Sequence, residues 1–185
     1  GKGRDSVVAL DGVDVIFGEE GDDVIKTGRG SLLNPSSGFS VRLGDLIFCG
    51  TDNDVVHADA PNADRSEDDI DVVFGGDGND ILYVYGGAEL AINDFRLGLG
   101  NLVFAGKGRD SVVALDGVDV IFGEEGSDVA NGGKGYNLDF EGFSINLGDF
   151  IFGQKGDDTL HGDTKDFTSG TEEDGIDLII CGEGD

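Results

Sequence analysis

Apolar residues in this chain occur in short runs, each followed by a glycine-rich turn. Val15-Ile-Phe17, Leu46-Ile-Phe48 and Val72-Val-Phe74 are three such runs, and four more have the same form. Runs this short, rich in β-branched and aromatic residues and bounded by Gly and Asp, indicate β-strands. Because neighbouring residues in a strand point to opposite faces, the middle residue of each run and the phenylalanine after it are expected on opposite sides.

These runs define two columns if the strands stack. The inner column is expected to be Ile16, Ile47, Val73, Val103, Ile121, Ile151 and Ile179. The outer column is expected to be Phe17, Phe48, Phe74, Phe104, Phe122 and Phe152. Two interpretations of the outer column are open: it is sheltered beneath inserted segments, or it is a lateral interface for self-association, since a contiguous exposed apolar stripe usually marks contact.

Acidic residues flank the apolar runs on both sides. Asp14, Asp45, Asp71, Asp119, Asp149 and Asp177 precede a run, and Asp23, Asp54, Asp80, Asp110, Asp128 and Asp158 end the turn that follows one. One run is preceded by Asn101 instead of an acid. Carboxylates at fixed places beside glycines predict a column of metal sites rather than one active site.

The composition supports this prediction. The 185 residues include 34 glycines and no Met or Trp, and Gly costs about 1 kcal/mol per helical position relative to Ala, so long helices are not expected. The formal net charge is −27. Such acidity suits either a solvated surface or bound cations, and the repeated placement of the carboxylates favours cations. It argues against nucleic acid as a partner, and no stretch approaches the ~20 apolar residues of a membrane span.

Repeats occur at two levels. Residues 1–21 and 106–126 are the same string, which gives a period of 105 residues. We therefore expect residues 1–185 to be a single β-solenoid segment of a longer repeat protein, with an internal repeat of 1–105 and 106–185, the second copy truncated. Repeats of this kind decide the architecture.

A nine-residue register lies within each block. Gly75–Tyr83 matches G-G-x-G-x-D-x-U-x in full, U being a large apolar residue, and Ala105–Val113, Ala114–Phe122 and Gly153–His161 are close variants. On these motifs the chain resembles the RTX, or haemolysin-type, calcium-binding repeat family. The resemblance implies an all-β fold, a parallel β-roll or β-helix solenoid. Independently, apolar strands this short are buried only if successive coils stack about 4.8 Å apart.

The coils are unequal in length. Successive strand phenylalanines are 31, 26, 30, 18 and 30 residues apart, so irregular coils with loop insertions are expected. The segment 86–95 could supply a third strand to its coil. Both a flattened two-sided roll and a larger, irregular β-helix therefore fit the sequence.

Calcium takes six to eight oxygen ligands and accepts irregular geometry, whereas Mg²⁺ demands near-ideal octahedra and zinc prefers His and Cys, of which two each are present. The resemblance implies that the twelve aspartates named above are the side-chain ligands of several Ca²⁺ ions. Weak sites are expected at Asn101, at Leu32 in the nonapeptide 27–35 and at Asn137 in 132–140. The turns at 51–53 and 66–70 lack the second turn glycine, so adjoining sites are also expected to be weak.

No catalytic residues are predicted. His57 and His161 occupy matching positions that duplication explains, and no nucleophile-elbow motif accompanies them. Cys49 and Cys181 fall five coils, or roughly 24 Å, apart in the stack. That separation excludes an intramolecular disulfide, and both are interpreted as small fillers.

The leading functional hypothesis is a calcium-binding structural or adhesive β-solenoid outside the bacterial cell, of a kind that could form filaments or a surface layer. The resemblance implies type I secretion, with folding triggered by external calcium. The alternative is an RTX export and folding tail of a secreted protease, lipase or epimerase. A glycan-binding β-helix enzyme is a third hypothesis, but only three tyrosines are available as platforms.

Overall fold

The structure, a computed structural model, describes residues 1–36, 39–59, 69–92, 95–140, 143–163 and 175–184. Within these ranges every regular element is a β-strand. The described part of the chain contains no helix long and apolar enough to cross a membrane.

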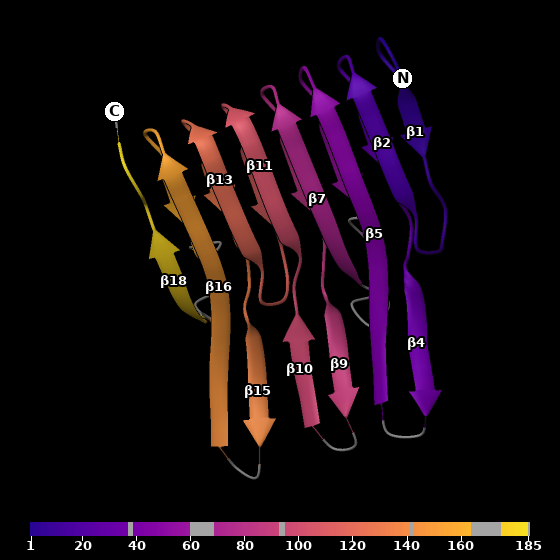
Figure 1. Ribbon diagram of the computed structural model, residues 1–185. Coiled ribbons are helices and arrows are strands. Elements are labelled where there is room, and N and C mark those ends of the chain that lie inside the picture. The colour runs from indigo at the N-terminus through magenta and orange to yellow at the C-terminus, as the bar shows by residue number, and fades with distance from the viewer. Residues whose placement is uncertain (37–38, 60–68, 93–94, 141–142, 164–174, 185) are drawn as a thin grey trace, which may run out of the picture.

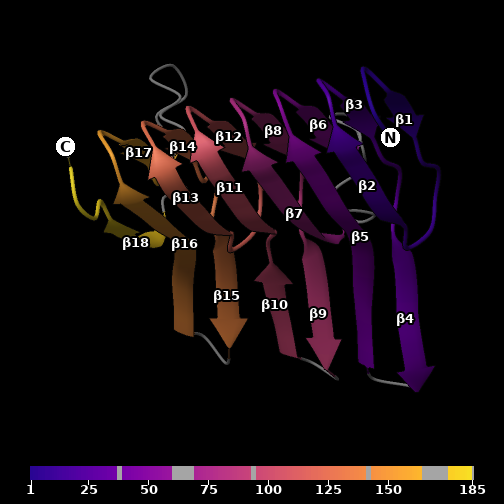
Figure 2. The same cartoon turned by 45° about the horizontal axis from the view of Figure 1, so that its top comes forward.

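Two sheets lie face to face and form a flattened, two-sided solenoid (Figures 1 and 2). The smaller sheet is a stack of β1 (Ser6–Val8), β3 (Val24–Lys26), β6 (Val55–Ala58), β8 (Ile81–Val84), β12 (Ser111–Ala114), β14 (Val129–Asn131) and β17 (Thr159–His161). The parallel part of the larger sheet is a stack of β2 (Val15–Glu20), β5 (Phe39–Thr51), β7 (Ile70–Asp77), β11 (Leu102–Gly108), β13 (Val120–Gly126), β16 (Phe143–Lys155) and β18 (Ile176–Ile180). This confirms the all-β solenoid and selects the flattened roll.

Each coil contains two corners. A strand of the larger sheet runs through a tight turn, the first corner, into a strand of the smaller sheet. The chain then returns through a second corner to the larger sheet, one coil further along. Equivalent residues pair in register from coil to coil, as Phe104 does with Phe74 on one side and Phe122 on the other.

The inserted material leaves the solenoid at the second corner. Its hairpins are β4 (Ser31–Ser36) with β5, β9 (Ala88–Ile92) with β10 (Phe95–Leu99), and β15 (Tyr136–Phe140) with β16, all antiparallel. They continue the larger sheet beyond the solenoid, as the lower half of Figure 1 shows. The expectation that segment 86–95 supplies a further strand to its coil is confirmed by β9, which extends the larger sheet.

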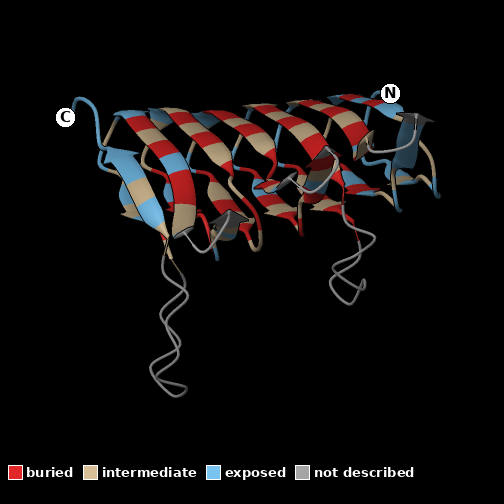
Figure 3. Cartoon of the chain, turned by 90° about the horizontal axis from the view of Figure 1, so that it is seen from below, coloured by how far each residue is buried: buried red, intermediate tan, exposed pale blue. Residues whose placement is uncertain are grey.

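The core is the space between the two sheets. Ile16, Ile47, Val73, Val103, Ile121 and Ile151 point into it from the larger sheet and are buried. From the smaller sheet they meet Ile25, Val56, Leu82, Val112 and Ala130. Buried and half-buried residues alternate along the central strands (Figure 3). Ile179 continues the column in register with Ile151 but is 39% exposed, because β18 is an edge strand.

The phenylalanine column lies on the outer face of the larger sheet, as expected. Consecutive rings from Phe17 to Phe152 are stacked with centroids 4.8–5.0 Å apart and planes within 12°. This spacing is that of hydrogen-bonded strands. Phe17 is 61% exposed and the other five are half-buried. The described hairpins lie beside this stripe rather than over it (Figure 1), so they do not shelter it.

Candidate metal centre: two aspartate ladders

The first corner carries a ladder of carboxylates. Each backbone N–H of a ladder residue donates to Oδ1 of the equivalent residue in the next coil, with N···O distances of 2.8–3.0 Å. The first ladder is Asp5, Asp23, Asp54, Asp80, Asp110, Asp128 and Asp158. Asp5 is a rung that the prediction missed, although it is the counterpart of Asp110 in the duplicated string.

The second corner carries a matching ladder immediately before the strands of the larger sheet. Its N···O distances are 2.5–2.9 Å. The second ladder is Asp14, Asp45, Asp71, Asn101, Asp119, Asp149 and Asp177. The structure thus brings all twelve predicted ligand aspartates into two continuous columns, one at each edge of the core.

The hydrogen-bonded ladders use only one oxygen of each carboxylate. Oδ2 is buried and has no hydrogen-bond donor in ten of the twelve predicted ligands: Asp23, Asp45, Asp54, Asp71, Asp80, Asp110, Asp119, Asp128, Asp149 and Asp158. The other two, Asp14 and Asp177, are half-buried. A buried acceptor without a donor is strongly unfavourable, and a regular row of them indicates that something other than hydrogen bonding neutralises these oxygens.

Glycines in the first ladder leave space beside these oxygens. A Cβ placed on Gly123 would lie 2.8 Å from Asp128 Oδ2 and 2.8 Å from the backbone oxygen of Gly153 in the next coil. Gly18, Gly75 and Gly153 have the same surroundings, each between a ladder Oδ2 and a carbonyl oxygen of the next coil. Oxygens from two adjacent coils therefore converge where a side chain would otherwise stand.

Cys49 and Ala105 occupy the same column as these glycines. The Cys49 thiol is buried and free, and burial raises its pKa, with the charges of Asp54, Asp80 and Asp23 adding to the effect. A protonated, buried thiol is inert, which fits the filler interpretation. Cys181 is free as well, and exposed.

Asn101 shows how a rung is completed without a cation. Its Oδ1 accepts the Asp71 N–H at 2.9 Å, as an aspartate would. Its Nδ2 donates to the backbone oxygen of Gly86 at 2.6 Å. The amide therefore keeps the ladder and satisfies the opposing carbonyl, and a weak calcium site at this rung stays a prediction.

The other two predicted gaps are wrong. Leu32 lies in β4, opposite Arg42, and Asn137 lies in β15, opposite Asn146. Both are in the antiparallel hairpins and belong to neither ladder. Both residues match the nine-residue register by position, but the segments that contain them lie outside the solenoid. Most of the turn at 66–70 lies outside the described residues.

The turn at 51–53 keeps its shape without a second glycine. Asp52 adopts a left-handed conformation with φ of 78°, which Asp tolerates better than most residues. Asn53 links the neighbouring coils, since its Nδ2 donates to Asp22 Oδ1 and its Oδ1 accepts from Asn79 Nδ2. The missing glycine therefore does not disrupt the adjoining Asp54 rung.

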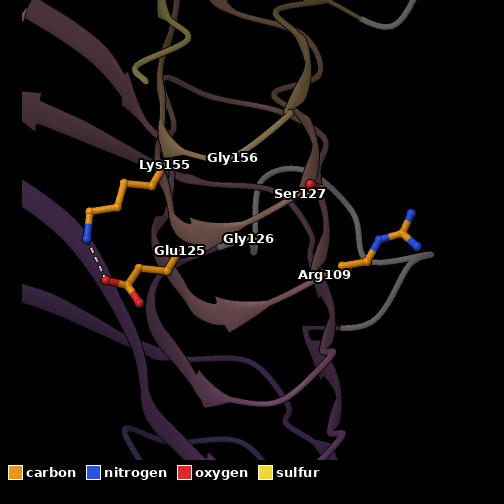
Figure 4. A pocket seen from close by; sticks show the side chains of 6 residues that line it. All are labelled: Arg109, Glu125, Gly126, Ser127, Lys155 and Gly156. Carbon is orange, nitrogen blue, oxygen red and sulfur yellow. Dashed lines mark hydrogen bonds and ion pairs between the residues drawn. The ribbon is translucent and has the colours of Figure 1, made fainter. Parts of the chain in front are cut away.

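The outer surface of the first corner carries compensating cations. Lys107 is paired with Asp77 at 2.8 Å and Lys155 with Glu125 at 2.6 Å. Figure 4 shows the second pair beside a shallow hollow over Gly126 and Gly156. These exposed pairs contribute little stability and do not reach the buried Oδ2 row.

Burial dominates the electrostatics of both ladders. Desolvation raises the pKa of Asp54, Asp110 and Asp149 to about 7, and that of Asp80 and Asp128 to about 6. It also raises the pKa of Asp45, and that of Asp71 and Asp119 well above the ordinary value. Neighbouring ladder carboxylates add to the shift in most of these cases. Asp54, Asp110 and Asp149 therefore hold protons over a range that reaches neutral pH, where a bound cation would compete with those protons.

The donor set fits calcium. It consists of carboxylate and backbone carbonyl oxygens in irregular, closely spaced groups, which are the ligands calcium accepts. When bound, Ca²⁺ would supply positive charge between coils, and the residues to hold it are the ladder aspartates with the carbonyls of the adjacent turns. His57 lies outside this set and stacks on Tyr83 at 4.9 Å.

These features define a calcium-binding repeat module built as a β-solenoid. The family model of the RTX calcium-binding nonapeptide repeat matches four segments, residues 1–31, 66–89, 103–138 and 147–164, which together make up more than half of the chain. The chain belongs to this family. No curated protein and no solved structure matched it.

Acidification is expected to stabilise the metal-free chain. The folded-state pKa values of about 6 to 7 lie above the ordinary value of 3.8, so the stabilisation is fully present below about pH 4 and is lost as pH rises through 6 to 7. Circular dichroism in metal-depleted buffer should show more β-structure at pH 5 than at pH 8. Calcium affinity should fall as the pH is lowered from 8 to 5, because protons compete with calcium for the same carboxylates. Metal-free β-content that does not rise on acidification would contradict the burial of these carboxylates.

Replacing a ladder Asp by Asn, and a ladder Asn by Asp, should have opposite effects on the amount of calcium that the chain needs to fold. Asp80→Asn keeps the Oδ1 acceptor but removes the charge, so the chain should bind one ion fewer, or bind it about ten-fold more weakly. Asn101→Asp loses the bond to Gly86 and adds a buried charge, so folding should need more calcium. Calorimetric titration gives the stoichiometry and circular dichroism the calcium midpoint. Asp157→Asn, at an exposed turn position, is the control and should behave like the parent.

Proposed function

We propose that this calcium-binding module is a structural element that acts outside a bacterial cell, as part of a rod whose shape calcium sets. The observation that carries the proposal is the row of ten buried Oδ2 atoms without donors. Neighbouring rungs are one strand spacing, about 4.8 Å, apart, and two carboxylate charges at that distance repel by roughly 3 kcal/mol at an effective dielectric of ~20. A chain with this many such rungs is favoured to fold only where calcium is abundant.

The setting outside the cell is supported by the same requirement. External calcium is in the range that weaker, extracellular calcium modules use, about 10⁻⁴–10⁻³ M. Membership of the RTX family is a further, weaker support, since these repeats are typical of secreted bacterial proteins. Export of the unfolded chain through a type I system, followed by folding in external calcium, is consistent with both.

A non-enzymatic role is part of the proposal. Among the described residues, the buried ionisable groups are mainly the repeated aspartates of the two ladders. They lie along the edges of the core and are not gathered in one cleft. The rival role, an export and folding tail of a secreted enzyme, uses the same calcium-dependent folding. The coding sequence around this segment discriminates them: further copies of the 105-residue block favour the rod, and an adjoining catalytic domain favours the tail.

Self-association is proposed for the outer phenylalanine column. Phe17 is 61% exposed and the rings form an unbroken stack along the larger sheet. Leu46, Val72, Leu102 and Val120 widen this stripe on the same face and are half-buried. A second solenoid laid against it would bury two apolar columns at once, which suits lateral assembly of rods.

Calcium should convert the chain from an expanded state to the β-solenoid. Below the required calcium concentration, charge and glycine content favour the expanded state, and ion binding supplies the free energy of folding. Circular dichroism during a calcium titration at pH 7.5 should show a cooperative rise in β-signal, with Mg²⁺ at equal concentration as the control. A fully β-structured chain in metal-depleted buffer at this pH would refute the proposal.

Removing two rings from the outer column should weaken association. Phe74→Ser with Phe104→Ser removes apolar area worth about 1.5–3 kcal/mol per side chain when buried, so any dimer should weaken at least about ten-fold. Sedimentation velocity in saturating calcium measures this, with Tyr83→Ser on the opposite sheet as the control. A parent chain that stays monomeric at all accessible concentrations would remove the basis for self-association, while leaving calcium binding intact.

A further inference from the structure

A third group of buried carboxylates lies outside the nonapeptide pattern. Asp59 directly follows β6 and Asp69 directly precedes β7, and neither occupies the acid position of a repeat turn. With Asp71 of the second ladder they form a cluster in which one carboxylate oxygen of each residue lies within 4.8 Å of the others. The three side chains are 3%, 0% and 0% exposed.

The hydrogen bonding of this cluster is incomplete. Both carboxylate oxygens of Asp69, and Oδ2 of Asp71, are buried without a hydrogen-bond donor in the described structure. Oδ1 of Asp71 accepts the Asp45 N–H at 2.6 Å. A fully buried carboxylate costs several kcal/mol as an isolated charge, and the other acidic groups of the cluster supply no positive charge to offset it.

The residues around Asp69 contribute a further backbone oxygen and little positive charge. Asp69 Oδ2 approaches the position where a Cβ on Gly30 would stand, and the backbone oxygen of Leu43 approaches the same position from the preceding coil. Burial raises the pKa of Asp69, and a side-chain hydrogen bond with Asp59 lowers it; the charge of Asp45 adds to the rise, and Arg42 acts in the opposite direction. One partly buried guanidinium does not balance a cluster of this charge.

The cluster is also held in place. The backbone N–H of Asp59 donates to Thr27 Oγ1 at 3.2 Å, across to the preceding coil. Asp59 adopts a left-handed conformation with φ of 63°. The carboxylates of Asp59 and Asp69 therefore come together between the end of β6 and the start of β7.

We propose that Asp59, Asp69 and Asp71 form a calcium site separate from the repeat turns, which ties the end of β6 to the start of β7. Three carboxylates with an adjacent carbonyl are a hard, all-oxygen donor set, and their irregular arrangement suits Ca²⁺ better than Mg²⁺. The insertion in the other block differs: the residue two positions before Asp177 is Gly175, where the first block has Asp69 before Asp71. The site is therefore a property of the first insertion and not of the repeat.

The test counts bound ions in the whole chain. Equilibrium dialysis against saturating calcium, with metal analysis, should find one ion fewer per chain in Asp69→Asn than in the parent, with the β-signal unchanged. Asp59→Asn, which keeps a residue that tolerates the left-handed conformation, should lose the same ion. The double variant should lose no second ion, because both residues serve one site. Asp157→Asn is the matched control and should bind as the parent does.

The outcomes separate this site from the ladders. Unchanged stoichiometry and affinity in both single variants would overturn the proposal, as would a second ion lost in the double variant. Unchanged stoichiometry with a more stable metal-free Asp69→Asn would show that the carboxylates share protons instead, which also overturns it. A parent chain that binds no calcium at all would refute the proposed function, whereas a parent whose calcium binding is indifferent to Asp59 and Asp69 refutes only this site.

Discussion

The stacking of the coils depends on the ladder aspartates, whose two carboxylate oxygens have different roles. Oδ1 accepts the backbone N–H of the neighbouring coil, which aligns the stack, and Oδ2 lies in the core edge without a donor. The first interaction holds for Asp and Asn alike, as Asn101 demonstrates. The second requires that a proton or a cation neutralise the carboxylate. Alignment of the coils and dependence on a cation are thus carried by different atoms of the same side chain.

This division explains why the core can remain small. The inward residues are valines, isoleucines, alanines, one leucine and Cys49, and each coil contributes only a few of them. The free energy gained from this small apolar core has to offset the conformational entropy lost when the glycine-rich turns become ordered. Glycine loses more of this entropy on folding than any other residue. Charge neutralisation along two columns is therefore part of the stability of the fold as well as its function.

Much of the fold could be read from the sequence because the signals were local and repeated. Alternation placed Ile47 inside and Phe48 outside, and the glycine–aspartate turns located both ladders. The predictions for Leu32 and Asn137 were wrong because both residues lie in hairpins outside the solenoid, although their positions match the nine-residue register. Asp59 and Asp69 could not be found in the same way, because their proximity depends on the path between β6 and β7. Whether the twelve predicted aspartates bind ions stays a prediction, with the geometry in its favour.

All described hairpins lie at the second corner. The two edges of the solenoid therefore differ in how well they tolerate inserted or deleted residues. A ladder hydrogen bond joins residues 18 positions apart in one coil and 31 in another, with nearly the same N···O distance. Closing the longer loop costs only roughly 0.5 kcal/mol more, so one edge can gain or lose whole hairpins while the register of the stack is preserved. The first corner, where the turn glycines meet the backbone of adjacent coils, has no such freedom. The solenoid therefore has a constant edge and a variable edge, and new surface can be added at the variable edge without altering the ladder on the opposite side.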